Sequence, residues 1–214
     1  MKKPLLLAVP AALLGCLCLS LAAPAATRGV QKEPPKAASA DTGSGSYSVD
    51  SVHSTVIFKI KHLNTSWAFG RFEKISGQFE LDDKSPEKSS VSITIDVDSI
   101  NTGSEKRDNH LKSPDFFDAA QFPSAVFTSK SVKKSGDGKF SVTGDLELHG
   151  VTKSVTIDLE RTGFSDSKMG VRIGFFGQLA LKRSDYGVSA MPDGIGDEAQ
   201  LTISVEAVRT DAKR

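Results

Sequence analysis

Twelve residues in the middle of the chain concentrate the side chains that could do chemistry. They are Arg107-Asp108-Asn109-His110-Leu111-Lys112-Ser113-Pro114-Asp115-Phe116-Phe117-Asp118. A histidine close to carboxylates and a Phe-Phe pair is compatible with general acid–base chemistry beside an apolar pocket, with His110 and Asp108 as the pair. A helix start explains the same residues, since Asp108 can cap it and Arg107 can pair with a carboxylate such as Asp185. The catalytic interpretation lacks a nucleophile or a metal, so the structural one is favoured.

The four histidines do not form a metal-ligand motif. They are His53, His62, His110 and His149. No two of them are two or four residues apart, and the only cysteines, Cys16 and Cys18, lie in an apolar N-terminal segment. We therefore expect histidines satisfied by hydrogen bonds, with no metal and no other cofactor.

Charged and aromatic side chains suggest a third use for the central segment, as a cap that contacts a ligand head group. The candidates are Arg107, His110, Lys112, Phe116, Phe117 and Arg183. The cationic members can donate charge-assisted hydrogen bonds to a phosphate or carboxylate. The two phenylalanines would face an apolar interior, one as a plug and one at an entrance. Pairing of each arginine with a nearby aspartate explains the arginines equally well.

The elements that must position this segment are predicted to be β-strands. Apolar and polar residues alternate in about eight runs, which is the period of a strand with one buried face. The runs span residues 56–60, 75–81, 91–97, 125–129, 140–148, 155–159, 171–181 and 201–207. Turn-type clusters at 82–86, 135–138 and 149–150 suit antiparallel neighbours. The one helical stretch lies within 106–118, where Pro114 limits it to about two turns.

Eight antiparallel strands with one apolar face can close as a sandwich or as a barrel. A sandwich fills its interior with side chains, whereas an eight-stranded barrel can hold one small ligand. All 12 phenylalanines fall between Phe58 and Phe176. Glycines inside the strands permit curvature and leave room; they are Gly77, Gly144, Gly174 and Gly177. The pattern favours a barrel around a long apolar ligand, with an ordinary filled core as the alternative.

The N-terminal residues predict export. Residues 1–25 combine a short basic start, an apolar stretch and Ala23-Pro24-Ala25, which is the pattern of a cleaved signal peptide. We therefore expect a periplasmic or secreted protein. Leu13-Leu14-Gly15-Cys16 also resembles a lipoprotein box, so anchoring through Cys16 is the alternative. Residues 26–46 are rich in Pro, Ala and Ser and predict a flexible linker, followed by one domain at 47–210.

The charge balance excludes one class of partner. Cleavage removes two of the 27 basic residues, Lys2 and Lys3, and leaves 25 against 26 acidic ones. A near-neutral chain lacks the basic stripe of a nucleic-acid-binding protein. Without Cys16 and Cys18 the mature chain has no thiol, which excludes disulfides and cysteine chemistry. No transmembrane span is expected in the mature chain, and a homodimer is compatible with the sequence.

A series of motifs, in order along the chain, resembles the YceI-like family. They are Tyr47-Ser48-Val49-Asp50 with His53-Ser54 and Phe58, then Phe69-Gly70-Arg71-Phe72, the central segment, Phe122-Pro123 with Phe127, Leu148-His149-Gly150-Val151-Thr152, and Arg183-Ser184-Asp185-Tyr186-Gly187. The last of these carries Tyr186 where the family more often has Phe. The resemblance extends from about Tyr47 to Val208, nearly the whole predicted domain.

The resemblance implies an all-β fold, an eight-stranded antiparallel lipocalin-like barrel with a short helical cap between strands. It also implies non-enzymatic binding of a long isoprenoid or fatty-acyl chain in an apolar tunnel, typically in the bacterial periplasm. Strand parity assigns the tunnel wall to the apolar face of each strand, and a slip of one residue would reverse that assignment. The predicted wall residues are Phe58, Ile60, Phe79, Ile93, Ile95, Phe127, Leu146, Leu148, Ile157, Phe175 and Leu179.

The sequence leaves the ligand and two other functions open. A polyisoprenoid, an isoprenoid quinone and a fatty-acyl chain all offer the same apolar chain to such a wall. A lipid-modifying enzyme using His110 with Asp108 is one alternative, and a filled barrel that serves as a structural or interaction domain is the other. Trp67 could line the tunnel or plug its end, and a lone tryptophan more often belongs to a core.

Overall fold

The computed structural model describes residues 43–211, which form eleven β-strands and one α-helix. The strands are β1 (Gly45–Val49), β2 (Thr55–His62), β3 (Ser66–Phe72), β4 (Ile75–Leu81), β5 (Ser90–Asp96), β6 (Ile100–Asn101), β7 (Ser124–Gly136), β8 (Lys139–Leu148), β9 (Val151–Ser167), β10 (Gly170–Lys182) and β11 (Ile195–Arg209). The helix is α1 (Glu105–Lys112), and the 3₁₀ turns are η1 (Pro86–Lys88), η2 (Val97–Ser99) and η3 (Arg183–Tyr186). The predicted signal peptide, Cys16 and most of the predicted linker lie outside the described residues. β1 begins at Gly45, so the end of the predicted linker belongs to the first strand.

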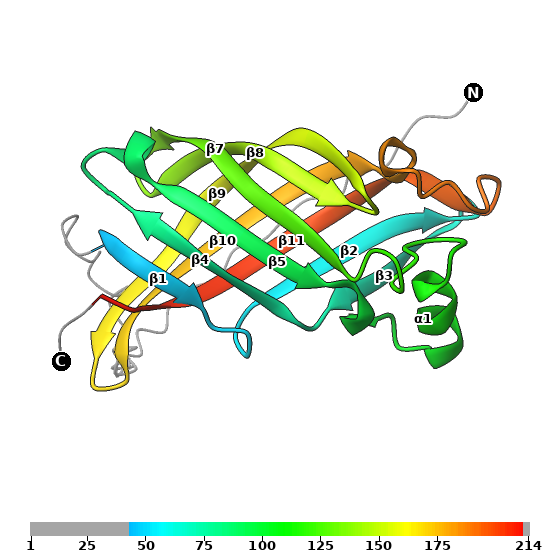
Figure 1. Ribbon diagram of the computed structural model, residues 1–214, viewed down its shortest axis with the longest axis horizontal. Helices are drawn as coiled ribbons and strands as arrows, with labels where there is room; N and C mark the ends of the chain where they lie inside the picture. The colour runs from blue at the N-terminus through cyan, green and yellow to red at the C-terminus, as the bar shows by residue number, and fades with distance from the viewer. Residues whose placement is uncertain (1–42, 212–214) are drawn as a thin grey trace, which may run out of the picture. The chain divides into compact units, whose positions relative to one another are not determined.

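The strands close into an eight-stranded antiparallel barrel, as the sequence predicted (Figure 1). The closed order is β1-β4-β5-β7-β8-β9-β10-β11, and β11 pairs with β1 again. β11 pairs with β1 near its C-terminal end and with β2 along the rest of its length. β2 also pairs with β3, and β3 pairs with β6. Consequently β1 with β2, β3 with β4, and β5 with β6 each act as one long strand with a break in it.

The breaks in these long strands keep their backbone groups satisfied. Between β3 and β4 the N–H groups of Glu73 and Lys74 both donate to Ser99 Oγ, at 3.1 and 3.0 Å. Ser99 Oγ in turn donates to the carbonyl of Asp96 at 2.6 Å, which joins this break to the one between β5 and β6. A buried backbone amide without a partner is costly, so Ser99 allows the wall to bend here without that cost.

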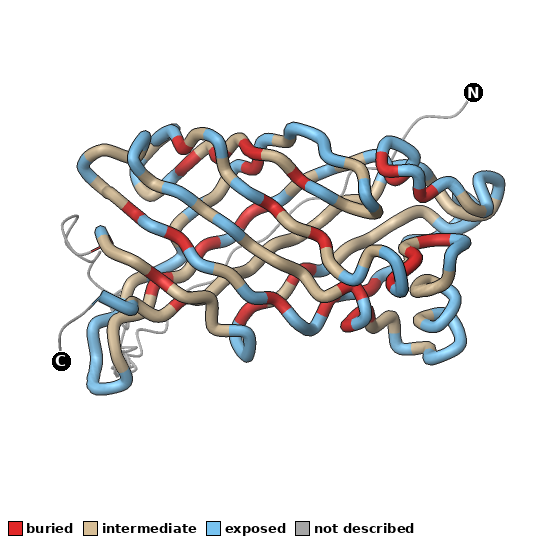
Figure 2. Tube along the Cα trace, in the orientation of Figure 1, coloured by how far each residue is buried: buried red, intermediate tan, exposed pale blue. Residues whose placement is uncertain are grey.

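Inward and outward residues alternate along the strands because the side-chain period of a strand is two. Buried positions in Figure 2 are therefore interspersed with exposed ones along the barrel wall, while α1 has no buried residue. The turn between β8 and β9 places His149 and Gly150 at φ of 51° and 72°, the backbone that a two-residue hairpin requires. At Gly144 an added Cβ would lie 2.3 Å from the carbonyl oxygen of Thr128 and 2.8 Å from Phe127 Cζ. This glycine thus permits close packing and does not leave the open room that we predicted.

One end of the barrel is closed by aromatic packing. Tyr47 stacks on Phe79 with ring centroids 5.0 Å apart, and Phe175 lies edge-on to Phe79 and Phe140 at 5.7 and 6.0 Å. The guanidinium of Arg161 lies over the rings of Phe140 and Phe175 and pairs with the largely buried Asp83. Burial of these rings makes this end a solid part of the core.

The opposite end carries α1, which is two turns long, as Pro114 led us to predict. Its apolar anchor follows the helix, where Phe117 lies edge-on to Phe72 of β3 with centroids 6.0 Å apart. β3 pairs with β6 only through Arg71 and Phe72, so residues 66–70 form a strand edge beside the helix (Figure 1). Trp67 lies on this edge with 39% of its surface exposed, and the expectation that it belongs to the core is wrong.

Candidate functional site

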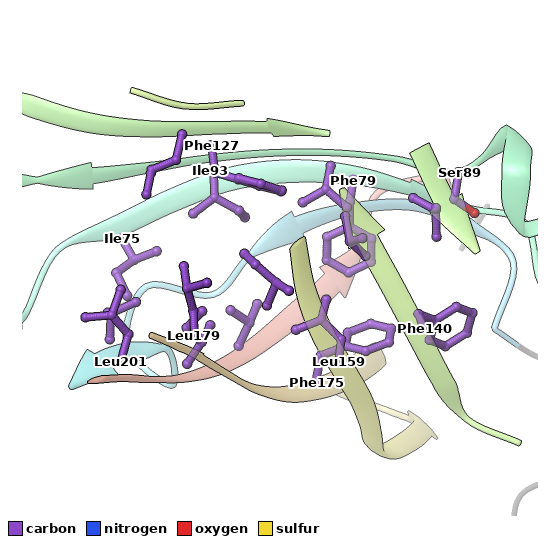
Figure 3. Close-up of a pocket in the computed structure, with 18 of the residues that line it drawn as sticks. Ile75, Phe79, Ser89, Ile93, Phe127, Phe140, Leu159, Phe175, Leu179 and Leu201 are labelled. Carbon is purple, nitrogen blue, oxygen red and sulfur yellow. The ribbon is translucent and has the colours of Figure 1, made fainter. Parts of the chain in front are cut away.

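The interior of the barrel holds an apolar cavity of about 130 Å³. Of its 21 lining residues only Glu80 and Ser89 are polar. Figure 3 shows hydrocarbon side chains converging from several strands, including Ile93 on β5, Phe127 on β7 and Phe175 on β10. Such a surface attracts the hydrocarbon part of a ligand and gives no hydrogen bonds to polar groups.

A second, wider cavity of about 730 Å³ lies at the α1 end; we call it the mouth. It is lined by β2, β3, α1, the segment after α1 and the loop before β11. The mouth and the inner cavity share four lining residues, Val56, Ile95, Leu146 and Leu201, so the two spaces adjoin. Together they form an apolar channel that is closed by the aromatic cluster and open beside α1.

All eleven predicted wall residues line this channel. The inner cavity is lined by Phe79, Ile93, Phe127, Ile157, Phe175 and Leu179, the mouth by Phe58, Ile60 and Leu148, and both by Ile95 and Leu146. The one-residue register shifts in β7 and β9 lie beyond the predicted wall residues of those strands, Phe127 and Ile157, so the alternation at these residues is kept. Their contact with a ligand stays a prediction.

Side chains do not fill the interior. Many apolar residues that line the channel are only partly buried, although they point away from the outer surface: Phe58, Ile60, Val91, Ile93, Ile95, Leu148, Leu159, Leu179, Leu201, Ile203 and Val205. A close-packed protein core leaves few voids larger than a water molecule. The residual exposure of these residues is therefore the surface of a real channel.

Five of the six predicted cap residues line the mouth: Arg107, His110, Phe116, Phe117 and Arg183. Lys112 lines neither cavity; its Nζ lies 3.9 Å from Asp98 Oδ1. Of the two phenylalanines Phe116 is buried, with the ring of His110 edge-on to it at 5.0 Å. Phe117 is partly exposed to the mouth.

Arg183 organises a loop more than it faces a ligand. Its guanidinium donates four hydrogen bonds of 2.7 to 3.0 Å, to the carbonyl oxygens of Val188, Ala190, Ile195 and Gly196. Burial lowers the pKa of Arg183 from its ordinary value, while the charge of Asp197 opposes that shift. With four of its five N–H groups engaged, Arg183 fixes the loop at 187–196 that forms one side of the mouth.

Arg107 binds its own helix start. Its Nε donates to Thr102 Oγ1 and its Nη2 to the carbonyl of Thr102, both at 2.7 Å. Asp108 accepts a hydrogen bond from the amide of Thr102 at 2.9 Å. The predicted Arg107–Asp185 pair does not form, because Asp185 Oδ1 lies 3.2 Å from Lys153 Nζ. Nη1 of Arg107 has no protein partner among the bonds described, so this guanidinium can still donate into the mouth.

The histidine–carboxylate pairs are not those the sequence suggested. His110 Nε2 lies 2.9 Å from Asp115 Oδ2, so the alternative pair of His110 with Asp108 is not formed. His53, Asp50 and Glu206 form one cluster with metal-ligand geometry in residues 43–211, which sequence spacing missed because Glu206 comes from a distant strand. Arg172 Nη1 donates to both carboxylates, at 2.6 and 2.5 Å, so a guanidinium already supplies the positive charge there. Arg172 and then His53 hold the pKa of Asp50 well below its usual range.

Sequence reasoning missed part of the mouth. Lys61, His62, Ser66 and Thr102 also line it, and among residues 43–211 its 27 lining residues include no aspartate or glutamate. Lys61 and Trp67 face each other across the β2–β3 ladder, with the ammonium 4.4 Å from the centre of the ring. Lys61 alternates with the inward-facing Phe58 and Ile60 and still lines the mouth, whereas Lys59 lines neither cavity.

The model of the YceI-like domain matches residues 47–207. The chain belongs to the YceI-like family. The Protein YceI of Salmonella newport (strain SL254) is 40% identical over 158 residues, which are 73% of this chain and 82% of that one.

Solved structures show the same barrel. The crystal structure of BcnA from Burkholderia cenocepacia matches with a TM-score of 0.68 at 29% identity, over 75% of this YceI-like chain and 99% of that one. The YceI protein of Campylobacter jejuni matches with a TM-score of 0.64 at 36% identity, over 71% and 90%. A polyisoprenoid-binding domain from Saccharophagus degradans, implicated in plant cell wall breakdown, shares the fold with a TM-score of 0.60 at 19% identity, over 77% and 98%.

Among the described residues of the YceI-like chain, no helix has the length and apolar character needed to span a membrane.

Proposed function

We propose that this chain binds a long-chain apolar lipid inside its barrel, without catalysis, in the periplasm or cell envelope. The lipid is a polyisoprenoid, an isoprenoid quinone or a fatty-acyl chain. The main observation behind the proposal is the channel. Its inner part is lined almost entirely by apolar side chains, and it adjoins the wider mouth.

The energetics of such binding are mainly hydrophobic. Each methylene removed from water contributes about 0.8 kcal/mol, so a chain of several isoprene units gains ample free energy in the channel. The mouth volume of about 730 Å³ lies within the usual range of ligand pockets. Because the mouth has the cationic and most of the polar lining residues, a ligand would enter chain-first and leave its head group beside Arg107 and His110.

A fold neighbour supports the choice of ligand class. The Saccharophagus degradans domain is named for polyisoprenoid binding, and its barrel superposes on nearly the whole domain. The location rests on the sequence of residues 1–25, which predicts export, with lipid anchoring through Cys16 as the alternative.

Native mass spectrometry of the protein purified from its own source tests the proposal. We expect an adduct whose mass corresponds to one apolar lipid, and uptake of a polyprenyl or fatty-acyl chain when the stripped protein is incubated with it. A protein that repeatedly carries no lipid and takes up none would contradict the proposal and favour a structural or interaction domain. Intact mass also reports whether the N-terminus is cleaved near Ala25 or lipidated at Cys16.

A blocking variant links the adduct to the channel. Leu146 lines both cavities, so Leu146→Trp should narrow their junction and abolish binding of long chains. Glu147→Trp is the matched control, because the same side chain is added at the next, exposed position on the outer face of β8. Thermal unfolding of both variants checks that the barrel forms. Full binding by a folded Leu146→Trp protein would place the lipid elsewhere.

Hydrolysis or isomerisation of labelled lipid is the test of the enzyme alternative. We expect no turnover by the wild-type protein, and therefore no effect of His110→Ala on product formation.

A further inference from the structure

Exposed apolar side chains gather at the mouth. The large exposed hydrophobic residues of the described chain are Val52, Ile57, Leu63, Trp67, Phe69, Met169, Phe176 and Met191. Four of these, Leu63, Trp67, Phe69 and Met191, lie on the two loops and the strand edge that border the mouth; we call them the rim. The other four are distributed over separate elements. Scattered exposed hydrophobics need no explanation, but a cluster beside a ligand channel indicates an interaction surface.

The rim is one structure because its two loops are bonded to each other. Leu63, in the β2–β3 turn, donates its backbone N–H to the carbonyl of Gly194 at 2.8 Å. Gly194 in turn donates to the carbonyl of Met191 at 3.0 Å. Trp67 and Phe69 follow on β3 and line the mouth itself, as does Met191. The rim therefore continues the apolar lining of the channel to the outer surface.

Two lysines lie directly on the rim. The ammonium groups of Lys59 and Lys61 lie 4.9 and 4.4 Å from the centre of the Trp67 ring. The nearest carboxylates on the cap have partners: Asp108 accepts from Thr102, and Asp115 lies against His110. Asp193, two residues after Met191, is the acidic residue of the adjacent loop. Within the described part of the chain, the mouth lining contains basic side chains and no acidic ones.

We propose that the rim docks the barrel on an anionic phospholipid bilayer, with Leu63, Trp67, Phe69 and Met191 at the level of the head groups and Lys59 and Lys61 on the phosphates. Tryptophan prefers the bilayer interface, and lysines extend their ammonium groups from apolar surface toward phosphate. Each basic residue near an anionic membrane adds to the attraction. Docking in this way places the channel opening against the membrane, so an apolar chain can pass between them without crossing water.

A second copy of the chain fits the rim less well. In a twofold dimer the same patch faces itself, so Lys59 and Lys61 would meet the lysines of the other copy without a carboxylate from the mouth lining. An anionic surface neutralises these charges, whereas a second rim repeats them.

The single tryptophan of the chain makes the proposal directly testable. The apolar residues 5–21 can bind vesicles by themselves in uncleaved protein, so sedimentation alone does not identify the rim. The fluorescence emission of Trp67 identifies the rim as the contact site, because this tryptophan lies on the rim. We expect a blue shift, and quenching by brominated acyl chains, with vesicles of phosphatidylglycerol and phosphatidylcholine in equal parts. Pure phosphatidylcholine vesicles should give little change, and added salt should weaken the response.

Two variant pairs separate charge from apolar contact. Lys59→Glu with Lys61→Glu should weaken binding to the anionic vesicles by about tenfold or more. Lys133→Glu with Lys134→Glu makes the same change in net charge on exposed positions of β7 toward the closed end, and should leave binding unchanged. Leu63→Ser with Phe69→Ser should lose the blue shift, whereas Val52→Ser with Met169→Ser should keep it. Thermal unfolding confirms that each variant is folded.

Three results would overturn the proposal. They are an unchanged Trp67 emission with anionic vesicles, equal losses in the two lysine pairs, and a dimer that dissociates when Leu63 and Phe69 are replaced. The last would assign the rim to a second copy. Docking is measured separately from lipid binding, since the vesicle assay gives its answer even if the channel is empty.

Discussion

The two ends of the barrel combine aromatic rings with cations, but only one end buries them. At the closed end Arg161 lies 5.6 Å from the ring centre of Phe140, which is 3% exposed. At the mouth Lys61 lies 4.4 Å from the ring centre of Trp67, which is 39% exposed. Charge compensation differs in the same way: Asp83 neutralises Arg161, whereas none of the described acidic residues lines the mouth.

The buried cation and the exposed cation therefore have different roles. A buried cation needs compensating partners, and the pairing of Arg161 with Asp83 leaves that guanidinium in a structural role. An exposed cation over an exposed ring adds little to folding, because water solvates both groups in the unfolded chain as well. The aromatic and charged residues of the mouth are thus available to contact something outside the chain, and those of the closed end are not.

The largest contrast is expected from truncating one ring at each end. Phe140→Ala should destabilise the protein by about 3–5 kcal/mol, because it opens a cavity in the aromatic cluster. Phe69→Ala at the mouth should change the free energy of unfolding by no more than about 0.5 kcal/mol, since more than half of its surface is exposed. Urea denaturation of the two variants measures both values. Similar losses would mean that the mouth is part of the folding core.

The next contrast compares an ion pair at each end. Arg161→Met leaves Asp83 largely buried without its partner and should cost about 3 kcal/mol, while Arg161→Met with Asp83→Leu should recover most of that loss. Asp185 lies two residues after the mouth residue Arg183, and Lys153→Met, which removes the exposed partner of Asp185, should cost less than about 1 kcal/mol. Failure of the double variant to recover stability would show that Arg161 acts through the aromatic rings and not through Asp83.

The barrel and its wall could be predicted from sequence, because strand period fixes which face each residue occupies. Phe79 and Phe127 lie on different strands, yet each lines the channel as its parity requires. The alternation did not predict β3, where small Ala68 and Gly70 take inward positions and Trp67 and Phe69 the outward ones. Residues 66–70 of β3 have no strand partner on the side away from β2, so their outward side chains can reach the mouth. Alternation along a strand does not show where a strand lacks a neighbour.

The cap could be placed from sequence, but the contacts of its charged residues could not. Arg107 was expected to reach Asp185, but it binds Thr102, five residues away. Local hydrogen bonds to a helix start compete effectively with distant ion pairs. Arg183 was a head-group candidate because its charge was visible, whereas the four carbonyls that surround it are set by the path of a loop. Loop carbonyls have no sequence signature.

Between the two ends, the bend after β1 should give the fold a measurable dependence on acid. Arg172 and His53 hold the pKa of Asp50 well below its usual range, so the charged pair stabilises the fold above about pH 4, the unfolded value. This stability is lost as the pH falls toward the lower, folded value. Asp50→Asn should therefore be clearly less stable than the wild type at pH 7 and approach it in strong acid. Unfolding at a series of pH values measures the difference in stability between the two proteins. A difference independent of pH would assign the effect to the hydrogen bond that Asp50 Oδ1 accepts from the amide of Val52.

The smallest expected effect concerns the cap, where Arg107 lines the mouth and Lys112 does not. If Arg107 donates to the head group of a bound lipid, Arg107→Gln should lower the affinity for a long fatty acid by about fivefold. The effect is small because the charge-assisted hydrogen bond of Arg107 would be partly exposed to water.

The fatty alcohol of the same length separates the two roles that the contacts of Arg107 allow. It fills the channel equally but has no carboxylate, so Arg107→Gln should leave its affinity unchanged. Lys112→Gln removes the same charge from the same helix, away from the mouth, and should leave both affinities unchanged. Titration of both ligands against both variants provides the comparison. If Arg107→Gln lowers the affinity for acid and alcohol equally, the guanidinium only holds α1 on Thr102. The head group would then have to be bound by another basic side chain of the mouth. Apart from the buried Arg183, these are Lys61, His62 and His110.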